Sequence, residues 1–176
     1  MSKYLVLSDI HGSIKYAKLA FSKYEQYGCK KILILGDILY HGPRNDLPEE
    51  YRPKEVIALC NNYKDKILAI KGNCDAEVDE MVLEFKLFNE VMLELNNHKF
   101  LLTHGHHLEE AEPDGYILYG HTHKTFFEDV YLNVGSVSIP KDGHYTYAII
   151  DEEKIVAYDL LTDDIIKEMK LSWLKC

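Results

Sequence analysis

Apolar and polar positions alternate in two different ways along the chain. In the first half, short continuous apolar runs are separated by longer segments whose apolar residues recur at helical spacing. The first helix has Ser13 as its N-cap and Gly28 as its stop signal, and Pro53 opens the second. Continuous apolar strands that alternate with helices are typical of a parallel sheet covered on both faces. The strands are predicted at residues 4–7, 32–35 and 67–70, and the helices at residues 13–27 and from residue 53 through residue 60.

The second half contains strand-like segments with short connections. Gaps such as Asp151–Glu153 suit antiparallel hairpins, and Met169, Leu171 and Trp173 alternate as they would in a strand. We therefore predict an α/β fold in which two packed β-sheets are flanked by helices, within a single domain of residues 1–176. The strands of this half are predicted at residues 91–95, 99–103, 117–119, 126–134, 145–150, 155–158 and 165–173.

The composition describes an ordinary globular protein with an acidic balance. Its 176 residues fit one domain, and 47% hydrophobic with 28% charged residues argue against disorder. Asp and Glu number 29 against 20 Lys and Arg, which gives a net charge of −9 with neutral histidines. No block of Lys and Arg stands out, which argues against long nucleic-acid duplexes as partners. A small anionic substrate is compatible with this balance, because bound metal ions can reverse the local field.

Cysteine usage and hydropathy indicate where the protein works. The four cysteines show no CxxC or paired spacing, and the N-terminal apolar run is too short for a signal peptide. No stretch approaches the ~20 apolar residues of a membrane span. We expect a cytoplasmic protein without a membrane partner. The apolar tail Leu171–Leu174 hints at self-association into a homo-oligomer.

Side chains that can bind metal ions follow the ends of the predicted strands. In open α/β folds, ligand sites gather at the carboxyl ends of strands, so loops that are distant in sequence converge on one crevice. A mixture of carboxylate, amide and imidazole ligands suits Mn²⁺, Fe, Zn²⁺ or Co²⁺. The segments are Asp9-x-His11, Gly36-Asp37, Gly72-Asn73-Cys74-Asp75, Thr103-His104-Gly105-His106 and Gly120-His121-Thr122-His123.

Each segment on its own has an ordinary structural explanation. Asp-x-His after a strand is as often a solvated loop or cap, and Gly-Asp and Gly-Asn-x-Asp are common turn sequences. The two segments with paired histidines are more specific, because such pairs at strand ends are rarely surface decoration. A functional site is favoured by the order of all five segments and by their shared position after strands.

Taken together, the five ordered segments resemble the calcineurin-like metallophosphoesterase superfamily over essentially the whole chain. Residues 39–45 and 133–141 are similar, in particular, to the small bacterial YfcE-type phosphodiesterases. The resemblance implies a four-layer αββα sandwich of two packed, mixed β-sheets flanked by helices. It also implies a dinuclear metal centre that hydrolyses phosphoric diesters.

The resemblance further implies a ligand set for two divalent metal ions per chain. One ion would be held by Asp9, His11, Asp37 and His123, and the second by Asp37, Asn73, His104 and His121, with Asp37 bridging. We expect Mn²⁺, with Ni²⁺, Co²⁺, Zn²⁺ or Fe as alternatives. A hydroxide between two ions ~3.5–4 Å apart is a nucleophile near neutral pH.

The candidate catalytic residues are Asn73, Cys74 and His106, and the candidate substrate-binding residues are Asn73 and Arg44. The Asn73 amide can donate to the phosphoryl group, and His106 either binds phosphate or is structural. Arg44 lies in a long loop after Asp37, where it either meets a substrate phosphate or is surface charge. Cys74 stands where many members of the superfamily carry a His that protonates the leaving group. It either favours diesters or is a small buried residue without a catalytic part.

The function implied first is hydrolysis of a small phosphodiester by a metal-bridging hydroxide, with weak activity on monoesters. A nucleotide phosphatase or nuclease of the same fold is an alternative that differs in substrate. A non-catalytic protein-interaction scaffold is another, for which the endosomal retromer subunit of this superfamily is the precedent. Against the scaffold, all seven implied ligand positions hold the superfamily's residue.

Overall fold

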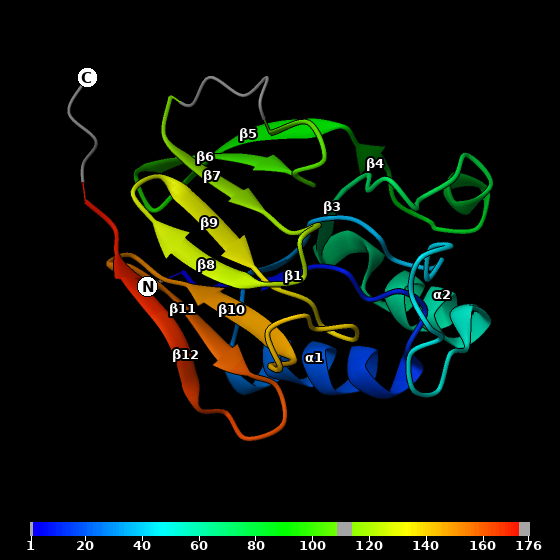
Figure 1. The fold of residues 1–176 in the computed structure, drawn as a ribbon. Coiled ribbons are helices and arrows are strands. Elements are labelled where there is room, and N and C mark those ends of the chain that lie inside the picture. The colour runs from blue at the N-terminus through cyan, green and yellow to red at the C-terminus, as the bar shows by residue number, and fades with distance from the viewer. Residues whose placement is uncertain (1, 109–113, 173–176) are drawn as a thin grey trace.

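The structure, a computed structural model, describes residues 2–108 and 114–172. Two mixed β-sheets pack face to face, and helices α1 and α2 cover the outer face of one of them (Figure 1). The helices are α1 Ile14–Gln26 and α2 Pro53–Asn62, and two short 3₁₀ helices are η1 Lys64–Lys66 and η2 Asp79–Met81. The strands are β1 Tyr4–Leu7, β2 Lys31–Ile34, β3 Ile67–Ile70, β4 Leu87–Phe88, β5 Glu90–Leu95, β6 His98–Thr103, β7 Tyr116–Tyr119, β8 Thr125–Glu128, β9 Tyr131–Val134, β10 Thr146–Ile150, β11 Lys154–Asp159 and β12 Ile165–Lys170.

The larger sheet has seven strands in the order β12-β11-β10-β1-β2-β3-β4. Strands β1 to β4 run parallel, and β10 pairs with β1 in the antiparallel direction. Successive side chains of a strand point to opposite faces. Leu5 and Leu7 accordingly pack beneath the helices, whereas Tyr4 and Val6 pack against the second sheet. The parallel sheet expected from the first half is therefore covered by helices on one face and by strands on the other.

The smaller sheet has five strands in the order β5-β6-β7-β9-β8. It is mixed, because β6, β7 and β9 run parallel to one another while β5 and β8 are antiparallel at the edges. Its inner face contributes Phe100, Leu102 and Leu118 to the core between the sheets. Two packed mixed sheets with helices outside confirm the predicted fold class.

One detail was left open by the sequence-based prediction, and two differ from it. Strands β10 to β12 pair with β1 and extend the first sheet, because every residue of β10 is buried and the strand needs neighbours on both sides. The single strand expected over residues 126–134 is a hairpin of β8 and β9, which turns where Asp129 adopts a φ of 52°. Within residues 2–108 and 114–172, no helix covers the outer face of the smaller sheet, so the fourth layer is not found there.

The predicted helix signals are confirmed. The Ser13 side chain accepts the backbone N–H of Tyr16 at the start of α1, and Pro53 occupies the first turn of α2. Strand β12 ends at Lys170, and Trp173 and Leu174 of the apolar tail lie outside the described residues. No helix in the described part of the chain is long and apolar enough to cross a membrane.

Candidate metal centre

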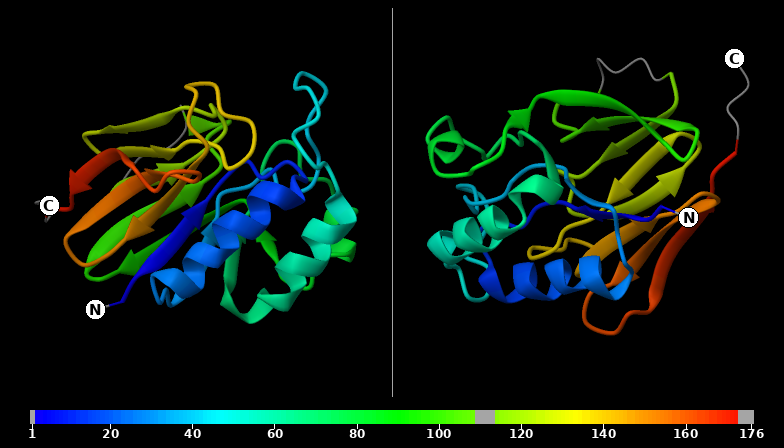
Figure 2. Two further views of the ribbon diagram at one scale, coloured as in Figure 1. Left: turned by 90° about the horizontal axis from the view of Figure 1, so that it is seen from below. Right: turned by 180° about the vertical axis from the view of Figure 1, so that it is seen from behind.

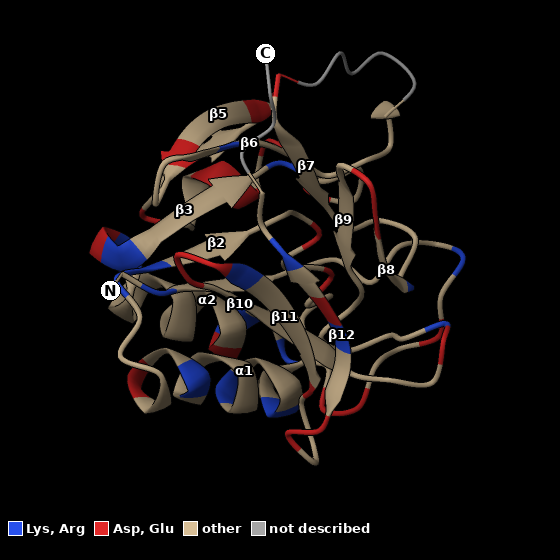
Figure 3. Ribbon diagram, turned by 90° about the vertical axis from the view of Figure 1, so that its left-hand side faces the viewer, with Lys and Arg blue, Asp and Glu red and all other residues tan. Residues whose placement is uncertain are grey.

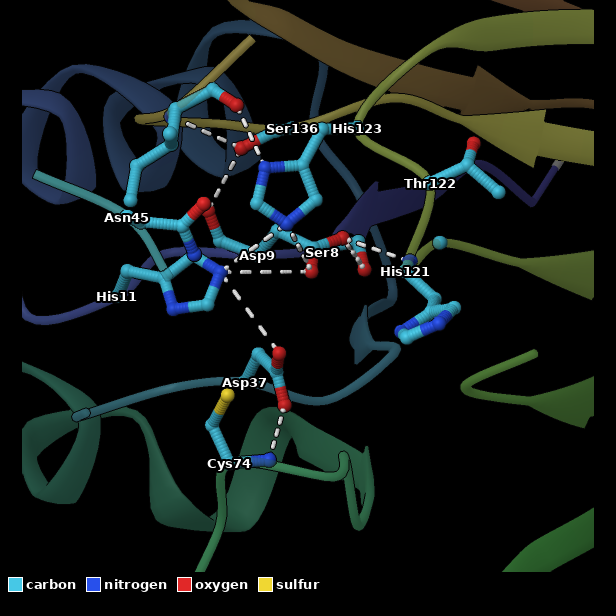
Figure 4. A network of polar contacts seen from close by, with 12 residues as sticks. Ser8, Asp9, His11, Asp37, Asn45, Cys74, His121, Thr122, His123 and Ser136 are labelled. Atoms are coloured by element: carbon cyan, nitrogen blue, oxygen red, sulfur yellow. Dashed lines mark hydrogen bonds and ion pairs between the residues drawn. The ribbon is translucent and has the colours of Figure 1, made fainter. Parts of the chain in front are cut away.

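The candidate ligands lie where neighbouring strands end. Asp9 follows β1, Asp37 follows β2 and Asn73 follows β3, and these three strands are parallel neighbours in the larger sheet. His104 follows β6, and the segment with His121 and His123 follows its parallel neighbour β7 in the smaller sheet. Parallel strands bring their carboxyl ends to one edge. The two sheets thus present their ligand loops to each other, as the sequence pattern predicted (Figure 4).

Three imidazole rings are fixed by backbone carbonyl oxygens. A carbonyl can only accept, so each Nδ1 carries the proton and each Nε2 is turned inward. The Nδ1 atoms of His11, His104 and His123 lie 2.6, 2.7 and 2.6 Å from the oxygens of Tyr40, Leu35 and Ile139, respectively. In the neutral form these rings therefore direct three lone pairs at the centre of the site.

The inward-facing nitrogens surround two buried carboxylates. Nε2 of His123 lies 3.2 Å from Asp9 Oδ1, and Nε2 of His11 lies 3.6 Å from the same oxygen. Asp37 Oδ2 lies 3.7 Å from Nε2 of His11 and 3.4 Å from Nε2 of His104. The Nε2 atoms of His11 and His123 are themselves 3.3 Å apart (Figure 4). All five side chains are buried.

Asp9 provides the test of whether this cluster fits a cation. Its Oδ2 accepts from Ser8 Oγ at 2.7 Å and from the backbone N–H of His121 at 3.0 Å. Its Oδ1 is fully buried and has no hydrogen-bond partner among the described residues. The facing nitrogens of His11 and His123 are within ion-pair distance of it, and in the neutral rings, whose protons sit on Nδ1, these nitrogens offer lone pairs rather than protons. While the rings are neutral, this buried oxygen is unpartnered among the described residues at a cost on the order of several kcal/mol, which protons on the rings or a divalent cation among these atoms would remove.

Electrostatics lead to the same conclusion. Burial raises the pKa of Asp9, but His11 and His123, in their protonated forms, outweigh it and hold the pKa of Asp9 far below its usual value. Burial lowers the pKa of His104, but Asp37 and Asp9 outweigh it and raise the pKa of His104 to about 9. The pKa of His11 is also raised, because Asp9 outweighs the effect of burial. In the absence of a cation these carboxylates hold protons on the rings, and metal binding would displace them.

The second set of implied ligands is more open. Asn73 is exposed, and its Oδ1 lies 3.0 Å from Nε2 of His104. His121 is half-buried, and its ring centroid lies 5.0 Å from that of His104. Three groups of His, Cys, Asp and Glu atoms in the described chain lie close enough to hold one ion, and His121 belongs to none of them. The structure therefore brings Asp9, His11, Asp37, His104 and His123 together and leaves His121 at the wall of the site.

Cys74 lies within reach of the innermost ligands. Its Sγ falls within 4.8 Å of ligand atoms of His11 and Asp37, and its backbone N–H donates to Asp37 Oδ1 at 2.8 Å. Burial, reinforced by the charge of Asp37, raises the pKa of Cys74 to about 12. The thiol is therefore neutral at physiological pH and is not a thiolate nucleophile.

Asp75 is a supporting residue to which the sequence assigned no role. Its carboxylate accepts the backbone N–H groups of Asp37, Ile38 and Gly72 at 2.8, 2.8 and 2.7 Å. Burial raises the pKa of Asp75, and these donors oppose that effect. The group ties the loop after β2 to the loop after β3. The acidic fourth position of the segment Gly72–Asp75 was the only sequence signal for this role.

Close approach explains two glycines in the ligand loops. A Cβ on Gly72 would collide with the Asp37 carboxylate, and one on Gly120 would collide with Ser8 Oγ. The ligand backbones are also strained, because non-glycine residues at positive φ cost of order 1–3 kcal/mol each. Five of the seven implied ligands have such a φ, namely Asp9, His11, Asp37, His121 and His123. Strain concentrated on these residues indicates that the loops were shaped for a site rather than for packing.

A cavity of about 520 Å³ opens over this cluster. Arg44 lies in its wall, as the sequence predicted, together with Asn73, Cys74 and His121. Lys141 lies there too, although the sequence assigned it no role. His106 lines a different cavity, beside Lys71 and His107, and its ring is tilted by 52° against that of His107 with centroids 4.3 Å apart. Burial lowers the pKa of His106, and the neighbouring histidines His104 and His107 add to that effect.

Comparison with known proteins agrees with this geometry. Residues 3–154 match the calcineurin-like phosphoesterase superfamily domain. The chain is 37% identical to phosphodiesterase YfcE of Escherichia coli, over 98% of this chain and all of that protein. It is 28% identical to phosphodiesterase MJ0936 of Methanocaldococcus jannaschii, over 85% of this chain and 92% of that one.

Solved structures extend the comparison to three dimensions. The structure of E. coli YfcE, described as a phosphoesterase, superposes with a TM-score of 0.93 at 36% identity and covers 97% of this chain and all of that one. Vacuolar protein sorting 29 from Cryptosporidium parvum superposes with a TM-score of 0.64 at 16% identity, over 97% of this chain and 98% of that one. The second similarity concerns the fold alone.

Proposed function

The chain belongs to the calcineurin-like phosphoesterase superfamily and is a phosphoesterase, and from that premise we propose that it hydrolyses a small phosphodiester with the help of two divalent metal ions. The observation that carries the proposal is the buried Oδ1 of Asp9, which has no hydrogen-bond partner among the described residues and lies among inward-facing imidazole nitrogens. A divalent cation would satisfy this oxygen while the rings stay in their neutral, ligating form.

Two neighbouring groups of side chains would hold the ions. The first is Asp9, His11, Asp37 and His123, in which every side chain has a facing atom within 4 Å of at least one other. The second is Asp37, His104, Asn73 and His121, with the Asp37 carboxylate common to both. The mixture of oxygen and nitrogen ligands suits Mn²⁺, which we propose first, and equally permits Ni²⁺, Co²⁺, Zn²⁺ or Fe.

When bound, divalent ions neutralise the phosphoryl oxygens and lower the pKa of the attacking water. The protein's own contribution is position. Backbone carbonyls lock the rings of His11, His104 and His123, and Asp75 locks the loop of Asp37. The exposed amide of Asn73 stands at the entrance, where it can donate a hydrogen bond to the substrate phosphoryl group.

Cys74 supports diesters as the preferred substrates. A neutral thiol with a pKa of about 12 neither carries positive charge nor gives up its proton readily. The dianion of a monoester with a poor leaving group depends most on a proton donor at this place, whereas a diester with a good leaving group depends on it least. Weak monoesterase activity follows.

The surface supports a small substrate. Lys and Glu are mixed along β12, and in this view blue and red segments are spread over the fold rather than gathered into one basic face (Figure 3). Nucleic-acid backbones need such a face. We propose a cytoplasmic enzyme, in keeping with the free thiols of Cys29, Cys60 and Cys74.

The test is hydrolysis of bis(p-nitrophenyl) phosphate and of p-nitrophenyl phosphate by metal-free protein, each with and without Mn²⁺. We expect turnover of the diester only with metal, slower turnover of the monoester, and loss of both in Asp37→Ala. Bound metal without turnover, in Mn²⁺, Co²⁺, Ni²⁺ and Zn²⁺ alike, would contradict the proposal and leave a non-catalytic scaffold as the alternative.

A further inference from the structure

Two cationic side chains that form no ion pair within residues 2–108 and 114–172 line the cavity above the candidate ligands. Arg44 belongs to the loop between β2 and α2, and Lys141 belongs to the loop between β9 and β10. Both are exposed, and neither forms an ion pair with any described residue. The two loops project in the same direction from the body of the molecule, one cyan and one golden (Figure 2, left). Cations that form no ion pair within the described part of an acidic chain of net charge −9 are available to an external anion.

Lys141 is tied to one of the candidate ligands. Its backbone N–H donates to the carbonyl of His123 at 2.9 Å, and two residues earlier the carbonyl of Ile139 accepts from the His123 ring at 2.6 Å. On the other side, the carboxylate of Asp142 accepts the backbone N–H of Thr125 at 2.6 Å. The loop is therefore anchored on both sides of Lys141, which fixes where its side chain starts.

The loop that carries Arg44 is held by hydrogen bonds near both of its ends. The carbonyl of Tyr40 accepts from the His11 ring at 2.6 Å, and the carbonyl of Glu49 accepts from Ser13 Oγ at 2.6 Å. Between these two ends, the Asn45 amide donates to the carbonyl of His41 at 2.8 Å. Arg44 thus stands on a supported loop beside the same candidate ligand cluster that anchors Lys141.

The cavity has room for more than the reacting phosphoryl group. Its volume of about 520 Å³ is that of a site for a whole small molecule. The reacting phosphoryl group belongs at the ligand cluster, where divalent ions would already supply its countercharge. The ring of Tyr40, which is 42% exposed, lines the wall on the Arg44 side and can pack against an organic group. The reacting phosphoryl group would therefore not need the positive charges of Arg44 and Lys141.

We propose that Arg44 and Lys141 together bind a second phosphate group of the substrate, which makes the substrate a phosphodiester that carries a further phosphate on its organic part. The inference rests on the proposed phosphodiesterase function and names its substrate class. Guanidinium and ammonium groups both form strong, charge-assisted hydrogen bonds with phosphate.

The experiment compares two probes that differ by one phosphate. They are thymidine 5′-(p-nitrophenyl phosphate) and the same ester with a 3′-phosphate, assayed with metal-loaded protein. We expect the 3′-phosphate to raise kcat/KM about tenfold, mainly through KM. Lys141→Gln and Arg44→Gln should each bring the ratio of the two kcat/KM values close to one, and Lys141→Arg should retain most of it. Lys124→Gln removes an equally exposed charge that does not line the cavity, and should leave the ratio unchanged.

A binding measurement separates this inference from the proposed function. Calorimetric titration with thymidine 3′,5′-bisphosphate and thymidine 5′-phosphate needs no turnover, and we expect the bisphosphate to bind about tenfold more tightly. Hydrolysis of neither ester, with this preference intact and lost in Lys141→Gln, would overturn the function and keep the cation pair. Hydrolysis of both esters at equal kcat/KM, with equal binding of both nucleotides, would overturn the cation pair and keep the function.

Discussion

The five innermost side chains of the site and the five at its mouth are held in different ways. The inner group, Asp9, His11, Asp37, His104 and His123, is buried, and its three rings are fixed by backbone carbonyls. The outer group, Asn73, Cys74, His121, Arg44 and Lys141, is exposed or half-buried. Two of its members, Arg44 and Lys141, stand on long loops. The fold fixes the side-chain positions of the inner group through several contacts, whereas the positions of the outer group depend more on the conformation of the loops.

This difference suggests a division of roles, in which the inner group supports the reaction itself and the outer group sets the preference among substrates. The buried Asp9 carboxylate, which has one oxygen without a hydrogen-bond partner among the described residues, is suited to binding a cation. An exposed arginine or lysine can be exchanged without disturbing the sheets beneath it. We therefore expect substitutions in the inner group to abolish activity with every substrate, and substitutions in the outer group to change the order of preference among substrates.

The largest effect should come from removing the carboxylate shared by both implied ion sites. Asp37→Asn should lower kcat/KM for bis(p-nitrophenyl) phosphate by about 1000-fold or more, because the negative charge proposed to hold both ions is lost. Metal content should fall in the same sample. Asp65→Asn, at an exposed position, is the matched control. Retained activity with reduced metal content would contradict the shared role of Asp37.

The inner group should also make the stability of the metal-free protein depend on pH. Asp37 and Asp9 raise the pKa of His104 to about 9 against the opposing effect of burial. Protonated His104 therefore stabilises the folded state fully below about pH 6.5, and that contribution is lost as the pH rises toward about 9.

Urea unfolding of chelator-treated protein at several pH values is the measurement. We expect the free energy of unfolding to fall by up to about 3 kcal/mol across this interval, and much less in His104→Gln. A loss of the same size in His104→Gln would assign it to other groups. Saturation with Mn²⁺ should remove the loss, because the cation replaces the protons.

A smaller effect is expected one layer behind the inner group. Asp75→Asn leaves one acceptor oxygen for three backbone donors and turns an NH₂ group toward one of them. The free energy of unfolding should fall by about 2 kcal/mol. Activity should fall about 10–100-fold, as for other groups that orient metal ligands. Unchanged activity and stability would show that the loop of Asp37 holds itself in place.

The smallest effect concerns the outer group. Cys74→His should raise the ratio of monoester to diester kcat/KM about tenfold, because an imidazole can supply the proton that the thiol withholds. Cys74→Ser, which keeps a small neutral side chain, should leave the ratio near that of the original protein. An unchanged ratio in Cys74→His would reduce Cys74 to a packing role.

The position of the inner group could be predicted from the sequence, because each of its loops directly follows a strand. Each ligand follows a strand that is apolar enough to be recognised, and parallel strands end together. Ser13 and Pro53 marked their helices for similarly local reasons. The turn at Asp129 was missed, because it interrupts an otherwise continuous strand pattern without Gly or Pro.

The remaining features depend on partners that are distant in the sequence. Strand β10 joins the larger sheet by pairing with β1 across about 140 intervening residues, which local patterning does not reveal. Lys141 lines the cavity because hydrogen bonds hold its loop next to His123, which is 18 residues earlier in the sequence. His106, only two residues from His104, lines another cavity. Its ring centroid nevertheless lies 5.5 Å from that of His104 and 6.1 Å from that of His121, so its role stays a prediction.

The central claim is that the inner group works only as a metal centre. The most direct test titrates Mn²⁺ into metal-free protein and follows bound ions per chain and hydrolysis of bis(p-nitrophenyl) phosphate in the same samples. The account predicts no turnover without metal and a rise that reaches its plateau at two bound ions per chain, with neither effect in Asp37→Ala. Full turnover in the metal-free protein, or two bound ions without turnover, would contradict it.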